Sequence, residues 1–152
     1  MQVPMVVKVP DVAPLRTNKL SSSIDLGPTL LDLCQVAAFD GMQGHSLAPL
    51  LEDAGASVRE YVLIEDDVAA ITAKLTPIPG KTRTIVTEDA RYTRNSKGEE
   101  QLFNLAEDYD EMTDLKNRDA VLRGTMVDRL TDALIEADDV ARGAPATHHT
   151  VL

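Results

Sequence analysis

The sequence predicts an α+β fold: a strand and a helix, then a small antiparallel sheet of three or four strands packed by a long C-terminal helix. Three observations support this class. An apolar, β-branched run opens the chain at residues 3–9, strand-like segments with short turns follow one another within residues 60–105, and residues 118–138 show a helical apolar period. The chain of 152 residues has room for one ordinary domain with a trailing segment.

Residues 3–9 are expected to form a buried strand, because a continuous apolar run rich in valine is typical of a strand that is covered on both faces. Such a strand needs neighbours on both sides. A chain that opens with one is either complete or the last part of something longer, and the sequence leaves both possibilities open.

A helix of about ten residues is expected next, with Asp25 or a neighbouring serine as its N-cap and Pro28 in its first turn, where a missing N–H does no harm. Its apolar residues share one face, which predicts packing against a core. They are Leu26, Leu30, Leu33 and Ala37. A short helix capped by Ser46 is expected at residues 46–52.

The centre of the chain predicts an antiparallel meander, because short segments of strand character alternate with turn signals such as residues 95–98. Residues 68–80 are expected to be an irregular loop that ends in a proline- and glycine-rich stretch. The expected strands are residues 60–64, 82–87, 90–94 and 101–105.

The last expected element is the amphipathic helix 118–138, which should lie across one face of the sheet. Its apolar positions are Leu122, Met126, Leu130, Leu134 and Ala137. We expect three parts in the chain: residues 1–56, residues 57–140 with the sheet and this helix, and a disordered tail at residues 141–152.

Charge and composition exclude several classes of partner. The chain has 25 acidic and 15 basic side chains and a net charge of −10, which repels phosphate backbones and anionic lipids. Aromatic residues make up only 3%, too few for a stacking platform for single-stranded nucleic acid. The sequence shows no signal-peptide pattern and no apolar run of transmembrane length. We therefore expect no nucleic-acid or membrane partner and, for the chain as written, a cytoplasmic location.

The residues by themselves predict no active site. The single cysteine, Cys34, lies in an apolar run and is expected to be a buried, inert thiol. His45 is the one histidine that could act as a base, since the other two belong to the expected tail. Neither acidic cluster, Glu65-Asp66-Asp67 or the group within residues 107–111, has the alternating spacing of a calcium loop. We expect no catalytic, cofactor-binding or metal-binding residue from spacing alone.

Four segments nevertheless share an ordered pattern with one enzyme family. Residues 23–33 match D-[LIV]-x-P-T-[LI]-L-[DE]-L, and residues 41–51 match G-x-S-L-x-P-L-L. Residues 100–115 resemble E-L-[YF]-[DN]-L-x-x-D-P-x-E-x-x-N-L, and residues 3–7 are similar to V-P-L-I-V. In this order and approximate spacing, over residues 3–138, the chain resembles the C-terminal part of arylsulfatase-like sulfatases of the alkaline phosphatase superfamily.

The resemblance implies that residues 1–56 are the tail of the large α/β domain of a sulfatase, as a strand and a helix, and that the rest is its small antiparallel subdomain. Tyr109 and Asp114 depart from the pattern, because the family has proline and asparagine there. Both lie in an expected surface turn, so the implied fold is unchanged.

The catalytic parts of a sulfatase lie upstream of the matched region. The resemblance implies that the parent enzyme uses a calcium-type divalent cation and a formylglycine, made from the Cys or Ser of a C/S-x-P-x-R motif. Cys34 is not followed by that proline and arginine, so no catalytic or metal residue of the family carries over. We expect the truncated chain to be inactive alone and to form part of the wall of a sulfate-ester pocket in the intact enzyme. The candidates for this wall are His45, Glu65, Asp66 and Asp67, with the loop that follows them to Gly80.

Two alternatives remain open. One is a non-catalytic module that binds a partner protein, either the missing N-terminal catalytic domain or a second copy of the chain. The other is the C-terminal part of a phosphonate or phosphodiester hydrolase of the same superfamily, because the nucleophile that distinguishes these enzymes lies upstream. The resemblance also leaves open which sulfate ester the parent cleaves and where the parent is located, since many sulfatases are exported.

Overall fold

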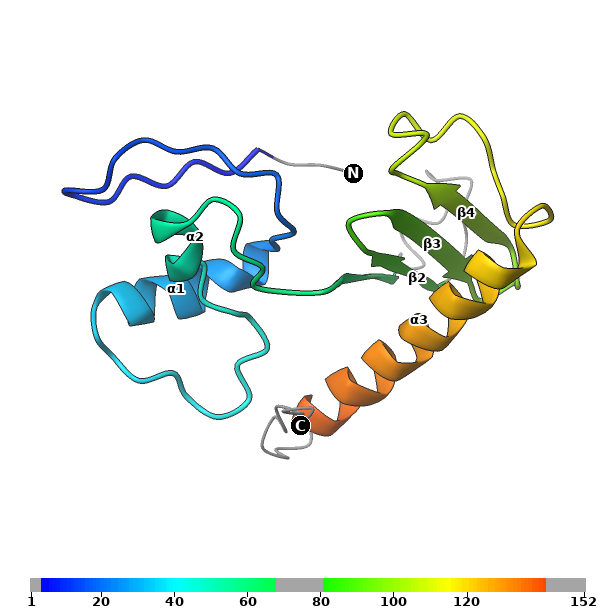
Figure 1. Cartoon of the computed structure of the whole chain (residues 1–152). Coiled ribbons are helices and arrows are strands. Elements are labelled where there is room, and N and C mark those ends of the chain that lie inside the picture. The colour runs from blue at the N-terminus through cyan, green and yellow to red at the C-terminus, as the bar shows by residue number, and fades with distance from the viewer. Residues whose placement is uncertain (1–3, 68–80, 142–152) are drawn as a thin grey trace, which may run out of the picture.

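The structure, a computed structural model, describes residues 4–67 and 81–141 of the chain. Its first part, residues 4–58, contains the short helices and is called the helical half below. It has a 3₁₀ turn at Ser23–Asp25, α1 at Leu26–Leu33 and α2 at Ala48–Glu52. The second half is a sheet followed by a long helix (Figure 1). Its strands are β1 (Val62–Asp67), β2 (Lys81–Val86), β3 (Ala90–Asn95) and β4 (Glu100–Asn104), and the helix is α3 (Ala120–Ala141).

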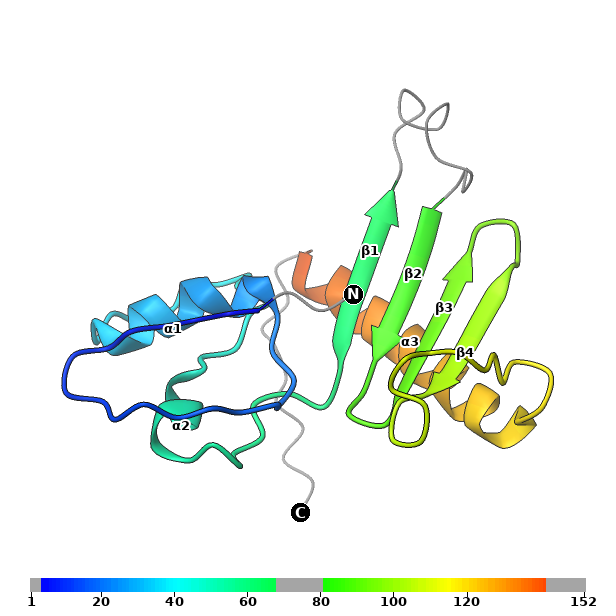
Figure 2. The ribbon, with the colours of Figure 1, turned by 90° about the horizontal axis from the view of Figure 1, so that it is seen from above.

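The sheet is an antiparallel meander with strand order β1-β2-β3-β4 (Figure 2). In its register Leu63 pairs with Ile85, Ile85 with Tyr92, and Tyr92 with Leu102. Side chains alternate between the two faces of a strand, so this row lies on one face. The turn between β3 and β4 needs Gly98, whose φ of +81° is readily adopted only by glycine. The predicted meander is confirmed.

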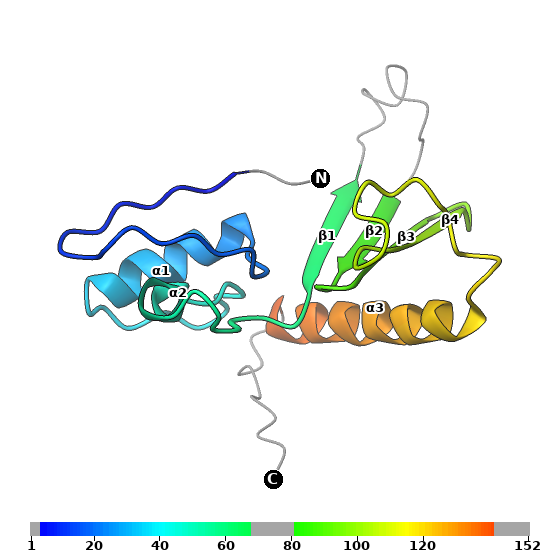
Figure 3. The ribbon, with the colours of Figure 1, turned by 45° about the horizontal axis from the view of Figure 1, so that its top comes forward.

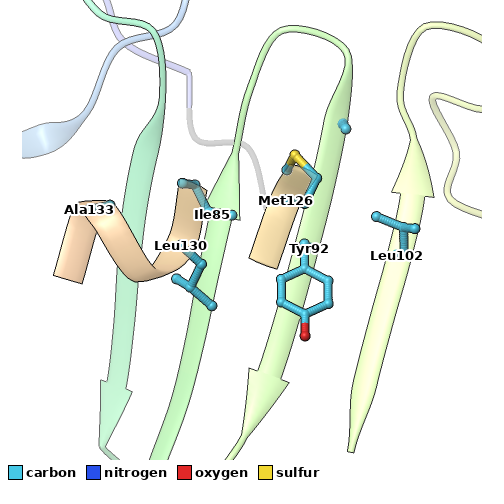
Figure 4. Close-up of a cluster of buried hydrophobic side chains, with 7 residues drawn as sticks. Ile85, Tyr92, Leu102, Met126, Leu130 and Ala133 are labelled. Carbon is cyan, nitrogen blue, oxygen red and sulfur yellow. The ribbon is translucent and has the colours of Figure 1, made fainter. Parts of the chain in front are cut away.

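α3 crosses the face of the sheet that carries this row (Figure 3). Ile85, Tyr92 and Leu102 pack there against Met126 and Leu130 of the helix (Figure 4). Fully burying one such side chain contributes about 1.5–3 kcal/mol. The predicted amphipathic helix and its apolar face are therefore confirmed.

The outer edge of β4 is covered by the chain that follows it. The backbone N–H of Leu102 donates to the Asp114 carboxylate at 3.2 Å, and the backbone N–H of Leu115 donates to the Leu102 carbonyl at 2.8 Å. Asp114 thus closes a strand edge, which would otherwise present unpaired backbone groups.

Three expectations for the first half are wrong. Residues 4–9 form no strand, because no described segment supplies the hydrogen-bonded neighbours that a strand requires. The leucines of α1 do not pack on a core: Leu26, Leu30 and Leu33 are exposed, while Pro28 and Thr29 are buried.

Cys34 is also exposed rather than buried, because it is the C-cap of α1 and lies where the helix ends in an exposed turn.

The strand boundaries differ less from the expected ones. β1 begins two residues later than expected and includes the acidic residues Glu65-Asp66-Asp67 as strand residues. The expected loop 68–80 and residues 142–152 of the expected tail lie outside the described residues, and the division at residue 56 stays a prediction.

Candidate functional site

The carboxylate of Asp25 is the polar centre of the helical half. It is fully buried, and each of its oxygens accepts two hydrogen bonds. Oδ1 accepts from the backbone N–H of His45 at 2.9 Å and from the Arg59 guanidinium. Oδ2 accepts from the backbone N–H of Ser22 at 2.7 Å and from Arg59 Nε at 3.1 Å. Because all four donors are present, the buried charge is paired and hydrogen-bonded.

Arg59 joins the helical half to the sheet. Its side chain is only 8% exposed, and it also donates to the carbonyl of Tyr61, immediately before β1, at 3.3 Å. A second link joins Lys19 to Glu88 at the β2–β3 turn, at 2.9 Å, and a third joins the Gln43 amide to the Ala137 carbonyl of α3, at 3.2 Å. Of these three links, only the first is buried.

The backbone around His45 is fixed on top of α1. The Thr29 hydroxyl donates to the Asp25 carbonyl at 2.6 Å and accepts from the backbone N–H of Leu47 at 2.9 Å. A side chain at Gly44 would lie 2.1 Å from the Ile24 carbonyl oxygen, so only glycine fits there. His45 itself is exposed. The structure therefore holds the backbone of this predicted wall residue firmly and presents its side chain outward.

The other wall candidates lie elsewhere. Glu65 faces Arg83 across the β1–β2 pair and forms an ion pair with it at 2.7 Å. Asp66, the next residue of β1, is exposed, and Asp67 is the last residue of the strand. β1 starts beside the helical half and runs away from it (Figure 2), so these acids lie at the strand end remote from α1 and α2. The structure does not gather His45 and the acidic residues into one group.

The acidic residues within 107–111 have structural roles. The Asp108 carboxylate accepts from the backbone N–H groups of Met112 at 3.1 Å and Thr113 at 2.7 Å, which closes a tight turn. Glu111 accepts two hydrogen bonds from the Arg91 guanidinium, at 2.7 and 2.6 Å. Among the described residues no group of three or more His, Cys, Asp or Glu side chains could hold a metal ion.

A shallow polar depression lies beside the β3–β4 turn and involves residues that the sequence did not single out. The Glu100 carboxylate lines it and accepts a hydrogen bond from Arg123 Nε at 2.7 Å. Arg94 forms a longer ion pair with the same carboxylate, at 3.8 Å. Burial by itself would raise the pKa of Glu100, but the hydrogen bonds and positive charges around it hold the pKa below its ordinary value. Acids and bases balance one another here, and the ion pairs of Glu100 join β4 to Arg94 of β3 and to Arg123 of α3.

Arg91 lies on the sheet face opposite α3. Its guanidinium lies 4.7 Å from the centroid of the Phe103 ring, and it donates to the Thr93 hydroxyl at 2.8 Å as well as to Glu111. These contacts fasten the segment after β4 to the sheet. The arginines of β3 were visible in the sequence, but the pairing of Arg91 with Glu111, 20 residues later, had no sequence signal. The helices of the described part of the chain do not include one whose length and apolar character would let it span a membrane.

Comparison with known proteins gives a consistent result. The family model described as N-sulphoglucosamine sulphohydrolase, C-terminal, matches residues 1–138. An arylsulfatase of Clostridium perfringens is 32% identical over 94 residues, which are 61% of this chain and 18% of that protein. The human N-acetylglucosamine-6-sulfatase is 41% identical over 71 residues, 43% of this chain and 12% of that protein. The chain thus spans less than a fifth of the curated relatives it matches.

Solved structures share the fold. A protein in complex with its substrate D-glucosamine-2-N,6-O-disulfate matches with a TM-score of 0.62 at 20% identity, over 82% of this chain and 25% of that one. A 2-O glycosaminoglycan sulfatase matches with a TM-score of 0.61 at 25% identity, over 78% of this chain and 25% of that chain. A phosphonate monoester hydrolase of Agrobacterium radiobacter matches with a TM-score of 0.57 at 23% identity, over 76% and 24%.

Proposed function

Because the chain belongs to the family of N-sulphoglucosamine sulphohydrolase C-terminal domains, we propose that it acts as the C-terminal portion of a sulfuric ester hydrolase. The family match over residues 1–138 is the observation that supports this proposal most strongly. Sulfatase relatives imply a formylglycine and a divalent cation in the parent enzyme, and both would be held by residues outside this chain.

The chain by itself is proposed to be inactive. Its one cysteine is not followed by the proline and arginine of the formylglycine motif. Cys34 is exposed at the end of α1, so its thiol is not enclosed in a site that would position it as a nucleophile. The role of the chain is then to complete the fold of the enzyme.

We also propose that the chain contributes to the wall of the substrate pocket. The support is chemical: the His45 backbone is locked by Asp25 while its side chain faces outward, as a residue that contacts a ligand needs. Glu65 and Asp66 offer a second set of polar side chains at the free end of β1, before residues that lie outside the described part.

The substrate class we propose is a sulfated amino sugar. The human relative acts on N-acetylglucosamine 6-sulfate groups by its name, and the family is named for N-sulphoglucosamine. The proposed wall has two separate parts, His45 and the acids of β1, and the acids suit such a substrate where they face its hydroxyl or amide groups, since carboxylates repel sulfate. We therefore assign Glu65 and Asp66 to the sugar rather than to the sulfate.

The test is a sulfatase assay on a chromogenic aryl sulfate with calcium or magnesium added. The purified 152-residue chain should give no turnover above a buffer blank. A chimera, in which the chain replaces the matching part of the Clostridium perfringens arylsulfatase, should give turnover, and the arylsulfatase cut off before that part should not. Turnover by the chain alone that is metal-dependent and survives Cys34→Ala would contradict the proposal.

One alternative shares the same fold. The phosphonate monoester hydrolase matches nearly as well as the sulfatases do, so this region of the fold does not by itself select the ester that is cleaved. Assaying the chimera with an aryl sulfate and with a phosphonate monoester in parallel measures how far this region contributes to the choice between the two esters, because the nucleophile of the chimera comes from the arylsulfatase. A chimera that prefers the phosphonate, in a sulfatase context, would assign the selectivity to this chain and favour the alternative.

A further inference from the structure

The sheet has one face that α3 does not cover. Figure 2 looks onto this face, with α3 behind the strands and the chain after β4 crossing the end at which β3 begins. Phe103, at that crossed end, is only 6% exposed. The opposite end of the face, beside the β3–β4 turn, is open in the described part of the chain.

Polar side chains from neighbouring strands lie together at this open end. They alternate along their strands with Ile85, Tyr92 and Leu102, which lie under α3, so they point away from the helix. We call them the polar strip. One row of the strip runs across three strands as Asp66, Thr82 and Asn95, and the next row as Thr84, Thr93 and Gln101.

Hydrogen bonds hold the middle of the polar strip in place. The hydroxyls of Thr84 and Thr93 share a hydrogen bond at 2.9 Å, and Arg91 donates to the Thr93 hydroxyl at 2.8 Å. The side-chain oxygen of Asn95 accepts from the backbone N–H of Glu99 at 2.9 Å, which closes the β3–β4 turn. These contacts preorganise the surface, as a binding site requires.

Three side chains of the polar strip have no partner. In the described part of the chain, the side chains of Asp66, Thr82 and Gln101 form no hydrogen bond or ion pair with another residue. Asp66 and Gln101 are exposed, and Thr82 is half-buried. Together they offer an anionic acceptor, a hydroxyl that donates and accepts, and an amide that does both. Adjacent strands lie about 4.8 Å apart, so these groups extend from β1 to β4 over about 14 Å.

A hollow lies over the part of the strip between β2 and β4. Its volume is about 350 Å³, and Thr93 and Gln101 are among the residues that line it. Small-molecule pockets have volumes of about 300–1,000 Å³. Lys116 also lines the hollow, but its ammonium donates to the Glu100 carbonyl at 3.0 Å and pairs with Asp114 at 3.3 Å. The hollow therefore offers hydroxyl and amide groups, while its cation is already paired.

We propose that the polar strip binds two linked, uncharged N-acetylhexosamine units, and this inference rests on the proposed function for the class of sugar. Sugar hydroxyls donate to the Asp66 carboxylate, and the Gln101 amide pairs with hydroxyl or acetamido groups of the second ring. Asp66 and Glu99, which lines the hollow, repel a sulfate group on the same surface. Of the two acids assigned to the sugar above, Asp66 belongs to the strip, because Glu65 points to the other face and pairs with Arg83.

The chemistry of the strip argues against other classes of ligand. A nucleic acid needs a surplus of basic side chains, and the six members of the strip include none. The core of a protein interface is apolar and aromatic, whereas Ile64, 40% exposed, is the exposed apolar side chain next to the strip. An uncharged ligand rich in hydroxyl and amide groups fits the strip best.

The test is a titration of the isotope-labelled 152-residue chain with di-N-acetylchitobiose, observed through backbone and side-chain amide signals. Signals of the strip, including the Gln101 side-chain amide, should shift with a dissociation constant on the order of 1 mM, because a few hydrogen bonds without aromatic stacking give weak binding. Thr82→Val and Gln101→Ala should each weaken binding by about threefold or more. Gln101 is exposed, so its variant tests the strip even if Thr82→Val does not fold.

The matched control for Thr82→Val lies on α3. Thr131 is exposed, and its hydroxyl donates to the Val127 carbonyl of its own helix at 2.9 Å. Thr131→Val should therefore leave the binding of the disaccharide unchanged. Equal weakening by Thr131→Val and Thr82→Val would overturn the inference.

A second pair of variants tests the selection against sulfate. The 6-O-sulfated disaccharide should bind more weakly than the uncharged one by about threefold or more, because it faces the carboxylates of the strip. Asp66→Asn should narrow this difference. Asp128→Asn, which changes the net charge equally at an exposed position of α3, should leave the difference unchanged. Equal effects of the two variants would contradict a local role of Asp66.

The outcomes separate this inference from the proposed function. No shift at the strip, or shifts confined to residues around His45, would overturn the inference. The aryl sulfate contains no sugar, so turnover by the chimera does not depend on the strip. An active chimera, together with a chain that binds no disaccharide, keeps the proposed function and overturns the inference. Binding at the strip without turnover by the chimera keeps the inference and contradicts the proposed function.

Discussion

At the scale of single residues, the pair Asp25–Arg59 is the contact on which the helical half depends most. Both side chains are out of water, and Arg59 also donates to the Tyr61 carbonyl just before β1, so the pair links the helical half to the sheet. Arg59→Met leaves the Asp25 carboxylate buried without its cation, which should destabilise the helical half by about 3–5 kcal/mol. Urea unfolding followed by α1 amide signals measures this loss.

The exposed pair Lys19–Glu88 is the control for Arg59. Its two side chains are 30% and 49% exposed, so Lys19→Met should cost less than about 1 kcal/mol. Equal losses for the two variants would show that burial does not decide the strength of these links.

Glycines 44 and 124 should respond to alanine in opposite directions. At Gly44 the added methyl group would lie 2.1 Å from a backbone oxygen, so Gly44→Ala must move the His45 backbone and should destabilise the protein by about 1–3 kcal/mol. Gly124 lies in α3 with nothing within 4 Å of the added carbon, so Gly124→Ala should stabilise it by up to about 1 kcal/mol. Thermal unfolding of both variants checks the signs, and a stabilised Gly44→Ala would contradict the geometry.

At the scale of elements, sequence periodicity predicted the sheet and α3 and misplaced α1. Ile85, Tyr92 and Leu102 fall within short segments of strand character, and their register follows from the short turns. The period of α1 was equally clear, but a helical period identifies an apolar face without saying whether anything covers it. The same limit applies to Cys34, whose apolar neighbours suggested burial. Asp25 was expected as a helix cap, while its pairing with Arg59, 34 residues later, had no sequence signal.

The strand β4 should confer an acid sensitivity on the sheet. Hydrogen bonds and basic neighbours lower the pKa of Glu100, and hydrogen bonds from the Leu102 and Lys116 backbones lower the pKa of Asp114, although burial opposes both shifts. A carboxylate whose pKa is lower in the folded state than in the unfolded state stabilises the protein at pH values above its unfolded pKa of about 4. This stabilisation is lost as the pH falls through the folded-state pKa. The unfolding free energy should therefore be steady near neutral pH and fall below about pH 4.5.

Glu100→Gln and Asp114→Asn should each make that fall less steep, because each removes one carboxylate that takes up a proton on unfolding. Glu107→Gln, at an exposed position of the same segment, should leave the slope unchanged. Guanidinium titrations at several pH values between about 3 and 7 measure the slope. An unchanged slope in both Glu100→Gln and Asp114→Asn would mean that other groups cause the acid sensitivity.

At the scale of the whole molecule, the two halves of the chain differ in how they are stabilised. The main cluster of buried hydrophobic side chains belongs to the sheet and α3, whereas in the helical half Leu47 and Leu50 are the large hydrophobic side chains that are buried among the described residues. The helical half is held by the Asp25 network and the small contact of α1 with α2, and it keeps its apolar side exposed. Its stability should therefore be the lower of the two.

Native-state hydrogen exchange tests this difference. The amides of Ile85, Tyr92 and Leu102 should exchange only through global unfolding, because their strands lie under α3. The α1 amides should exchange at least about tenfold faster, which is about 1.4 kcal/mol, through an opening that leaves the sheet intact. In the chimera the α1 amides should approach the protection of the sheet. Equal protection in the isolated chain would mean that the halves unfold as one unit, and the Asp25–Arg59 pair would then couple them more strongly than the difference in their hydrophobic packing indicates.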